Sequence, residues 1–129
     1  STPIVEDEII YGVDPGAGAL IAARASDGER IWKTVTPIDA ESSRPRGPSN
    51  GTAFIVKNGD RYFFFNDSGD LILASLSAKG YQGIGRFHVL EATNNTGPRN
   101  VVWSHPACAQ KYLFARNDKE LVCVSLASK

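Results

Sequence analysis

The feature of this sequence that most constrains its fold is an internal repeat of about fifty residues. Pro3, Phe54 and Pro106 mark equivalent positions at which a strand begins, and they lie 51 and 52 positions apart. Each copy continues with a second apolar strand, a turn rich in Asp, Asn or Gly, and a third apolar strand. A period of this length is typical of arrays in which each unit is a small sheet that packs against the next one.

Short apolar runs separated by turn residues predict antiparallel strands and almost no helix. The expected strands are residues 4–5, 9–13, 20–24 and 30–35 in the first copy, 52–56, 61–66, 70–76 and 81–90 in the second, and 103–109, 112–116 and 120–126 in the third. Because residues 63–65 and 71–73 are apolar on consecutive positions, we expect both faces of the second sheet to be covered.

These patterns predict an all-β chain with about two and a half four-stranded antiparallel blades of a β-propeller, arranged as an open arc. We expect one partial propeller domain over residues 1–129, with a blade at 1–36, a loop at 37–51, a second blade at 52–92 and a half blade at 101–127. An arc leaves sheet edges and blade faces bare, which closed propellers avoid. The expected partners are therefore the remaining blades of a parent propeller, or other copies of this chain joined through open sheet edges.

Charge and hydropathy argue against two classes of partner. Fourteen basic and fourteen acidic residues give a net charge of zero, and no segment gathers Lys and Arg into a long run, so nucleic acid is not an expected partner. The apolar run at 62–65 is far shorter than the roughly 20 residues of a membrane helix, so membrane insertion is not expected. The sequence begins at Ser1 without a basic and then apolar leader, which predicts a mature or excised fragment.

The two cysteines are not expected to form a disulfide. Cys108 falls on the first strand of the last unit and Cys123 on its third strand. Two strand spacings of about 4.8 Å place their Cα atoms beyond the limit of about 7 Å for a bridge. We expect two buried, unpaired thiols.

A resemblance to a known family becomes visible at the end of the first unit. Residues 22–32 place Ala, Gly and Trp at the spacing of the tryptophan-docking motif of PQQ-type β-propellers. Together with residues 12–14 and 103–106, they make the chain resemble the PQQ-binding-like repeat family, which includes PQQ-dependent dehydrogenases and the propeller lipoprotein of the outer-membrane β-barrel assembly machinery. The nearest likeness is to the C-terminal blades of uncharacterised secreted propellers of planctomycete-like bacteria.

The resemblance implies a bacterial, periplasmic or extracellular chain whose motif residues are structural. In such motifs the indole packs against the neighbouring blade while its N–H finds a buried acceptor. The residues that the resemblance assigns to blade docking are Ala22, Gly28, Trp32, Ala74, Gly80 and Trp103.

The chain also departs from the family pattern. Arg24 and Leu76 stand where the motif carries Asp, and Ile84 stands where Trp would follow Gly80. Quinone enzymes of the family also use an acidic base, a calcium site and often adjacent cysteines, none of which maps onto this sequence. We therefore expect no cofactor.

The candidate catalytic residues in this sequence are better explained by structural roles. Ser104 and His105 are adjacent on an expected strand, so their side chains would point to opposite faces and could not form a nucleophile and base. His88 is expected to be a solvated strand residue. Two histidines and two separated cysteines do not have zinc-binding spacing.

Two acidic turns complete the set of candidates. Residues 66–70 alternate oxygen-bearing side chains like the start of a calcium loop, but Gly69 comes too early, so a hairpin turn is expected. Residues 6–8 could act as paired acids, yet they lie at an expected hairpin tip, where solvation would leave their pKa values ordinary.

Two hypotheses for function remain. The first is a non-catalytic scaffold or protein-interaction module that binds a partner chiefly through the loops at 39–50 and 91–100. The residues assigned to this surface are Arg44, Arg46, Asn50, Asn94, Asn95 and Arg99. The alternative is a fragment of a PQQ-type oxidoreductase whose active site lies in blades outside this chain.

Overall fold

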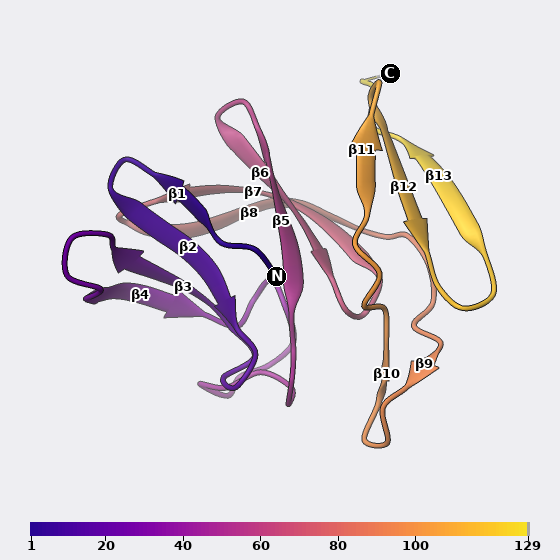
Figure 1. The fold of residues 1–129 in the computed structure, drawn as a ribbon, viewed down its shortest axis with the longest axis horizontal. Coiled ribbons are helices and arrows are strands. Elements are labelled where there is room, and N and C mark those ends of the chain that lie inside the picture. The colour runs from indigo at the N-terminus through magenta and orange to yellow at the C-terminus, as the bar shows by residue number, and fades with distance from the viewer. Residues whose placement is uncertain (129) are drawn as a thin grey trace.

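In the computed structural model, which describes residues 1–128, the chain is an open arc of antiparallel sheets. Two sheets have four strands, one has three and one has two. Figure 1 shows how the sheets follow one another along the arc. The predicted all-β architecture is confirmed. No helix occurs in this described part, so none is long and apolar enough to cross a membrane.

Three of these sheets are blade-like and follow one another along the arc. Blade 1 consists of β1 (Ile4–Glu6), β2 (Ile9–Asp14), β3 (Ala19–Arg24) and β4 (Arg30–Thr34). Blade 2 consists of β5 (Ala53–Asn58), β6 (Arg61–Asn66), β7 (Asp70–Ser77) and β8 (Gly80–His88). Blade 3 consists of β11 (Ala107–Ala109), β12 (Tyr112–Arg116) and β13 (Leu121–Ser125), and within the described residues it has no fourth strand. Neighbouring strands in each blade are also consecutive in the chain, which makes each blade a simple meander.

Blade 2 is covered on both faces because β6 carries aromatic residues at consecutive positions. Phe64 is fully buried in the cluster shared with blade 1, together with Leu20 and Ile72. Phe65 is 2% exposed and packs in the cluster shared with blade 3, together with Leu113. Side chains alternate between the faces of a strand, so consecutive aromatic residues supply both interfaces.

The second inter-blade connection differs from its prediction. The connector expected at 91–100 contains a short hairpin of β9 (Asn94–Asn95) and β10 (Asn100–Val101). Asn95 Oδ1 accepts a hydrogen bond from Gly97 N (2.9 Å), and Thr96 N donates to Arg99 O (3.0 Å), so local side-chain and backbone bonds close this turn.

The first strand of blade 3 is shorter than predicted. It begins at Ala107 instead of residue 103. Pro106 directly precedes this strand and has no N–H to donate to a ladder, which explains why pairing starts after it.

The two thiols are unpaired as predicted, but the expectation that they are buried is wrong. Cys108 and Cys123 are both exposed. Cys108 pairs with Leu113 and Cys123 with Phe114, so the two cysteines lie on opposite faces of blade 3. Cys123 is open because no sheet covers its face of blade 3 within the described residues, whereas Cys108 lies on the edge strand β11, on the face that packs against blade 2.

We predict that the Phe65→Ala variant loses about 3–5 kcal/mol of unfolding free energy, since a large side chain leaves a cavity between two packed sheets. Urea denaturation followed by circular dichroism would measure this loss. Phe87→Ala is the matched control, because Phe87 is 58% exposed on β8, and we expect it to cost less than about 1 kcal/mol. Equal losses in both variants would contradict the packing described for blade 2.

Candidate functional site

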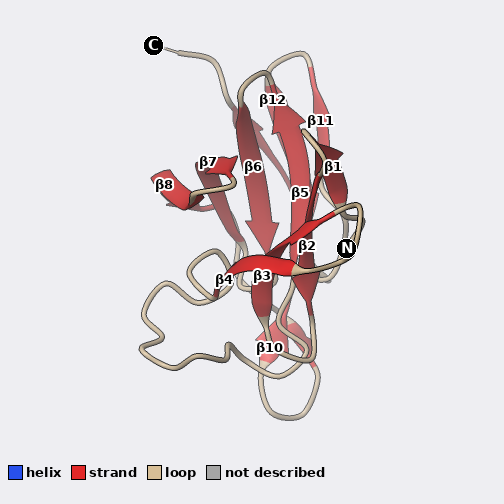
Figure 2. Cartoon of the chain, turned by 90° about the vertical axis from the view of Figure 1, so that its left-hand side faces the viewer, coloured by secondary structure: helices blue, strands red, loops and turns tan. Residues whose placement is uncertain are grey.

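The inter-blade connections gather at one end of the blades, shown at the bottom of Figure 1 and Figure 2. We call this surface the loop face and define it by residues 37–51, 91–104 and the turns 14–18, 66–70 and 117–120. Arg46 donates a hydrogen bond to Gly16 O (2.6 Å), which ties the first connection to blade 1. Arg99 donates to Ser49 O (3.4 Å), which joins the two connections. The sequence elements expected to form a common surface therefore lie side by side.

Two buried asparagines hold the connections to the blades. Asn66 is 1% exposed, donates to Pro37 O (3.1 Å) and accepts hydrogen bonds from the backbone of its own turn. Asn117 repeats this arrangement in blade 3, where Nδ2 donates to Glu91 O (2.9 Å) and Oδ1 accepts from two turn amides. We call these side chains the asparagine latches, because each one fixes the segment that arrives from the preceding blade.

The asparagine latches were not predicted as functional residues. Asn66 lies in a segment that is expected to be a hairpin turn, and Asn117 falls between two expected strands, yet they lie 51 positions apart, the spacing of the repeat itself. The signal that could have identified them is the recurrence of one turn residue at one place in successive units. In blade 1 the corresponding turn carries Asp14, whose Oδ1 accepts only from Gly16 N (2.8 Å).

A buried ion pair lies beside the first latch. Asp67 is 1% exposed, and its Oδ2 accepts hydrogen bonds from Arg99 (2.6 Å) and from Thr52 N (3.0 Å). Asp67 O also accepts a hydrogen bond from Val102 N (2.8 Å). The turn in blade 2 is thereby bound to both connections. Arg99, predicted as an interaction residue, is largely committed to this internal pair.

His88 is exposed on β8, as expected, and it also bridges two carboxylates. Nδ1 lies 2.7 Å from Asp70 Oδ1 and Nε2 lies 2.9 Å from Glu91 Oε1. These hydrogen bonds, to Asp70 first and Glu91 second, raise the pKa of His88. Arg86 also pairs with Asp70 (2.6 Å) and donates to Thr36 O (2.8 Å), so the cluster links blade 2 to both connections.

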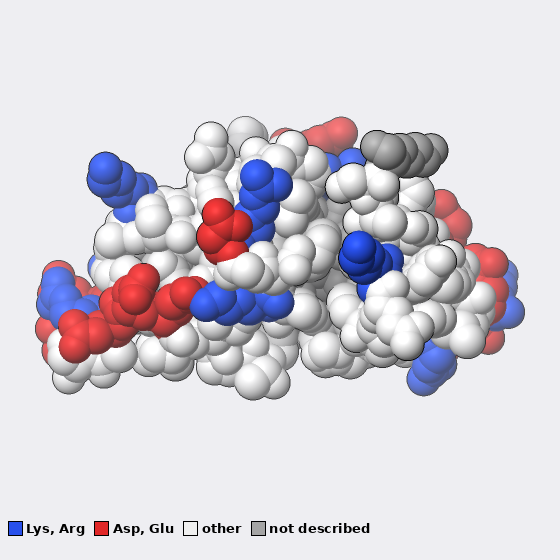
Figure 3. Space-filling model, turned by 90° about the horizontal axis from the view of Figure 1, so that it is seen from above, with Lys and Arg blue, Asp and Glu red and all other residues white. Residues whose placement is uncertain are grey.

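Glu6 also differs from its expected role at a solvated hairpin tip. It binds Lys57 and Tyr62 of blade 2, and hydrogen bonds from Lys57 and then Tyr62 lower the pKa of its carboxyl group. The pKa of Tyr62 is raised, mainly by burial and then by this bond. The carboxylate therefore fastens blade 1 to blade 2 at the end opposite the loop face. Figure 3 views that end from above and shows acidic and basic side chains interspersed over it.

The motif residues around Trp32 lie at the interface of blades 1 and 2. The indole N–H of Trp32 donates to Ser77 O on β7 (2.8 Å), and its ring packs against the buried cluster between the sheets. Ala22 and Ala74 are fully buried there. Gly28 has a φ of 75° in the turn before β4, and Gly80 has a φ of 147° at the start of β8.

Trp103 lies apart from these residues, on the loop face. Its side chain is 47% exposed, and it lines a hollow of about 190 Å³ with Asn94, Ser104 and Arg116. A second hollow, of about 390 Å³, is lined by Asp39, Glu41, Ser42, Ser43, Arg44, Arg46, Gly47 and Pro48. Both hollows are shallow features of the loop face.

Of three further predicted loop residues, Asn50 lies on the first connection, whereas Asn94 and Asn95 are neighbours on β9. Asn50 has a left-handed φ of 56° just before blade 2. Asn94 pairs with Val101 in the β9–β10 hairpin, and Asn95 donates from Nδ2 to Asn100 Oδ1 (3.1 Å). Of these, Asn95 is occupied in closing its own hairpin.

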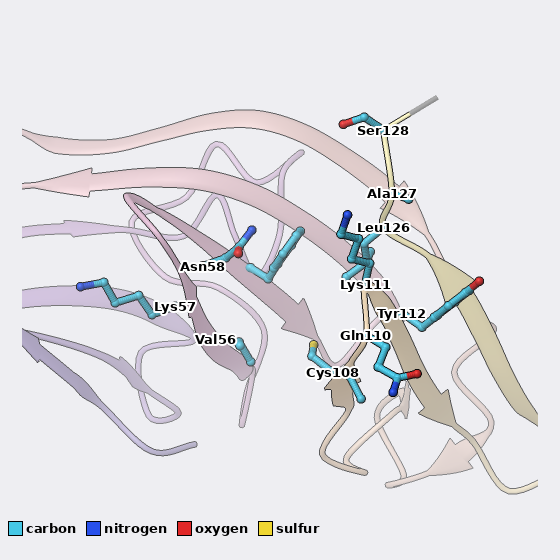
Figure 4. Close-up of a pocket in the computed structure, with 12 residues that line it drawn as sticks. Val56, Lys57, Asn58, Cys108, Gln110, Lys111, Tyr112, Leu126, Ala127 and Ser128 are labelled. Atoms are coloured by element: carbon cyan, nitrogen blue, oxygen red, sulfur yellow. The ribbon is translucent and has the colours of Figure 1, made fainter.

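A larger cleft of about 530 Å³ opens between blades 2 and 3 at the end away from the loop face. Figure 4 shows the turn after Cys108 on one side of this cleft and Val56 of β5 on the other, with Lys57 directed away from it. Burial raises the pKa of the Cys108 thiol, which disfavours the nucleophilic thiolate. The cleft therefore lacks an activated nucleophile at this cysteine.

His105 has a structural environment. Its ring packs on Phe54 with centroids 4.4 Å apart, and Nδ1 lies 2.7 Å from Pro106 O. Within residues 1–128 no group of three or more His, Cys, Asp or Glu side chains is arranged to hold a metal ion.

We predict that Asn66→Ala and Asn117→Ala each lower the unfolding free energy by about 1–3 kcal/mol, because each removes the hydrogen bonds of a buried side chain to a carbonyl group of the incoming connection and to two turn amides. Chemical denaturation would measure the loss. Asn94→Ala, at an exposed position where the side chain makes no hydrogen bond within the described residues, should change stability by less than about 0.5 kcal/mol. A latch variant as stable as this control would show that the latches do not hold the connections.

We also predict that His88 makes stability depend on pH. Because its folded pKa lies above the ordinary value of 6.5, its contribution is fully present below that pH and is lost as pH rises through the raised value. The half-exposed ring limits the effect to under about 1 kcal/mol. Thermal unfolding of wild type and His88→Gln between about pH 6 and pH 9 should give curves that converge toward high pH, and parallel curves would contradict the bridge.

The sequence was compared with known families and proteins. No family model matches the chain, and no curated protein matches it. The resemblance to PQQ-type repeats stays a prediction from the sequence motif.

Proposed function

We propose that the chain is a non-catalytic scaffold that presents its loop face to a protein partner. The observation that carries this proposal is that Arg99, in the second inter-blade connection, donates hydrogen bonds to Ser49 O in the first connection and to Asp67 in a turn of blade 2. These bonds hold the two connections together. A loop surface that is held in place before binding costs less entropy to order than a flexible one.

Some side chains on this surface are bonded within the chain, and others are exposed and able to contact a partner. Arg46, Arg99 and Asn95 are used within the chain. Arg44 and Trp103 are exposed, and neither side chain is held by a hydrogen bond in the described part of the chain. Trp and Arg are enriched among the residues that dominate the energy of protein interfaces. The proposed binding residues are therefore Arg44 and Trp103, with Asn94 beside the latter.

The ionisable groups with perturbed pKa values support a structural role for the blades. Glu6, Tyr62 and His88 each face a partner on another segment, and those contacts connect blades or connections. The pKa of Cys108 is raised by burial, which disfavours the reactive thiolate. The alternative, a fragment of a quinone oxidoreductase, has no comparable set of residues in its support.

We predict that a photo-reactive amino acid placed at Trp103 or at Arg44 crosslinks one and the same protein in native extract. The same reagent at Gln110, in the turn at the opposite end of the blades, is the matched control and should not capture it. Mass spectrometry would identify the captured protein. Excess wild-type chain should compete, whereas a chain carrying Trp103→Ala and Arg44→Ala should not.

Two outcomes would contradict this function. Capture at Gln110 as strong as at Trp103 would show that the loop face is not the binding surface. Stoichiometric binding of pyrroloquinoline quinone in the presence of calcium, seen by absorbance, would favour the oxidoreductase alternative.

A further inference from the structure

Each blade has two faces with distinct roles. The forward face points to the next blade along the chain, and the backward face points to the preceding blade. In blade 2 the forward face carries Phe63 and Phe65, which pack in the cluster shared with blade 3. The backward face carries Tyr62 and Phe64, which pack in the cluster shared with blade 1. The same forward-on-backward contact thus occurs twice within the chain.

The forward face of blade 3 is mostly apolar and uncovered, although Arg116 and Ser125 also lie on it. Tyr112 is 44% exposed, Phe114 37% and Leu121 71%. Phe114 stands 51 positions after Phe63 and pairs with Cys123 across the sheet, as Phe63 pairs with Leu73 in blade 2. This face therefore reproduces the kind of surface that blade 2 buries against its successor.

The backward face of blade 1 is the second uncovered face. Val5 is 64% exposed and pairs with Ile10, which in turn pairs with Ala23. Ile21 lies on the same face of the sheet, and Ile10, Ile21 and Ala23 are each half-buried. This is the face that a preceding blade would cover, and it is built mainly from aliphatic side chains.

We propose that the forward face of blade 3 docks on the backward face of blade 1 in a second copy of this chain. The two bare faces lie at opposite ends of the arc, so one chain cannot bring them together by itself (Figure 1). Two copies joined head to tail at both ends form a ring of six blades, within the range of about 4–8 blades found in propellers. Three copies would exceed that range, so the expected assembly is a dimer.

A second copy is the occupant that continues an interface already present in the molecule. The aromatic side chains of a forward face meet the aliphatic and aromatic side chains of a backward face at both internal junctions. Among the described residues, blade 1 offers the one uncovered backward face, and blade 3 the one uncovered forward face. A head-to-tail contact between two different faces closes into a ring when the rotation that it sets between successive copies leads back to the first copy.

The test measures the mass of the wild-type chain and three variants by light scattering coupled to size exclusion. Wild type should run at twice the chain mass of 13.9 kDa. Phe114→Glu on the forward face and Ile21→Glu on the backward face should each weaken dimerisation by at least about 100-fold, because each replaces an apolar side chain of the junction by a carboxylate that loses its water on docking. Phe87→Glu makes the same change on exposed β8 and should leave the dimer intact.

Mixing the two defective variants tests the head-to-tail arrangement directly. Each retains one intact face, so the mixture should form a heterodimer through one junction, although neither variant dimerises alone. Circular dichroism that matches wild type would show that each variant is folded. Alkylation of Cys123 in a Cys108→Ala background should be slower in the dimer than in the Ile21→Glu variant, because Cys123 lies in the junction.

Three results would overturn the proposal. The first is a wild-type chain that stays monomeric at about 100 μM, a concentration far above the dissociation constant of a specific interface. That result would indicate that further blades of a longer chain cover the two faces. Loss of the dimer in Phe114→Glu but not in Ile21→Glu would indicate contact between two forward faces. The reverse pattern would indicate contact between two backward faces.

Discussion

The arc depends on the burial of blade 2 between two neighbours. A sheet with large apolar side chains on both faces loses the hydrophobic free energy of one face if either neighbour is removed. Phe64 and Phe65, adjacent in β6, are both almost fully buried, although they point to different blades. Each end blade has only one face buried against a neighbour, so its other face stays exposed. This asymmetry between the middle and the ends of the chain underlies the proposed assembly.

Polar groups then fix how the blades are oriented. Hydrophobic contact between sheets is not directional, whereas the latches Asn66 and Asn117 bind single carbonyl groups on the incoming connections. The pair of Asp67 and Arg99 adds a buried, charge-assisted bond at the same end. Function is proposed at this end because its loops are positioned by the same bonds that hold the blades together.

Local features of the chain were predicted well, and features that depend on neighbouring segments were not. The strand at Arg61–Asn66 and its turns follow from apolar runs and turn residues, which act over a few positions. The burial of Cys123 and the free state of Glu6 were expected wrongly. His88 is exposed as expected, but its bridge to Asp70 and Glu91 was not predicted. Each of these depends on which segment lies opposite, and sequence spacing alone does not supply that partner.

By itself, the sequence determined the all-β class, the number of strands in each blade and the alternation that gives blade 2 two apolar faces, because these follow from local propensity and a period of two residues. Only the tertiary structure decided that Trp103 lies exposed on the loop face, that Arg99 is used internally, and that Phe114 is left bare. Exposure is a property of the assembled sheets. A residue becomes buried or available only when a neighbouring blade covers its face or leaves it open.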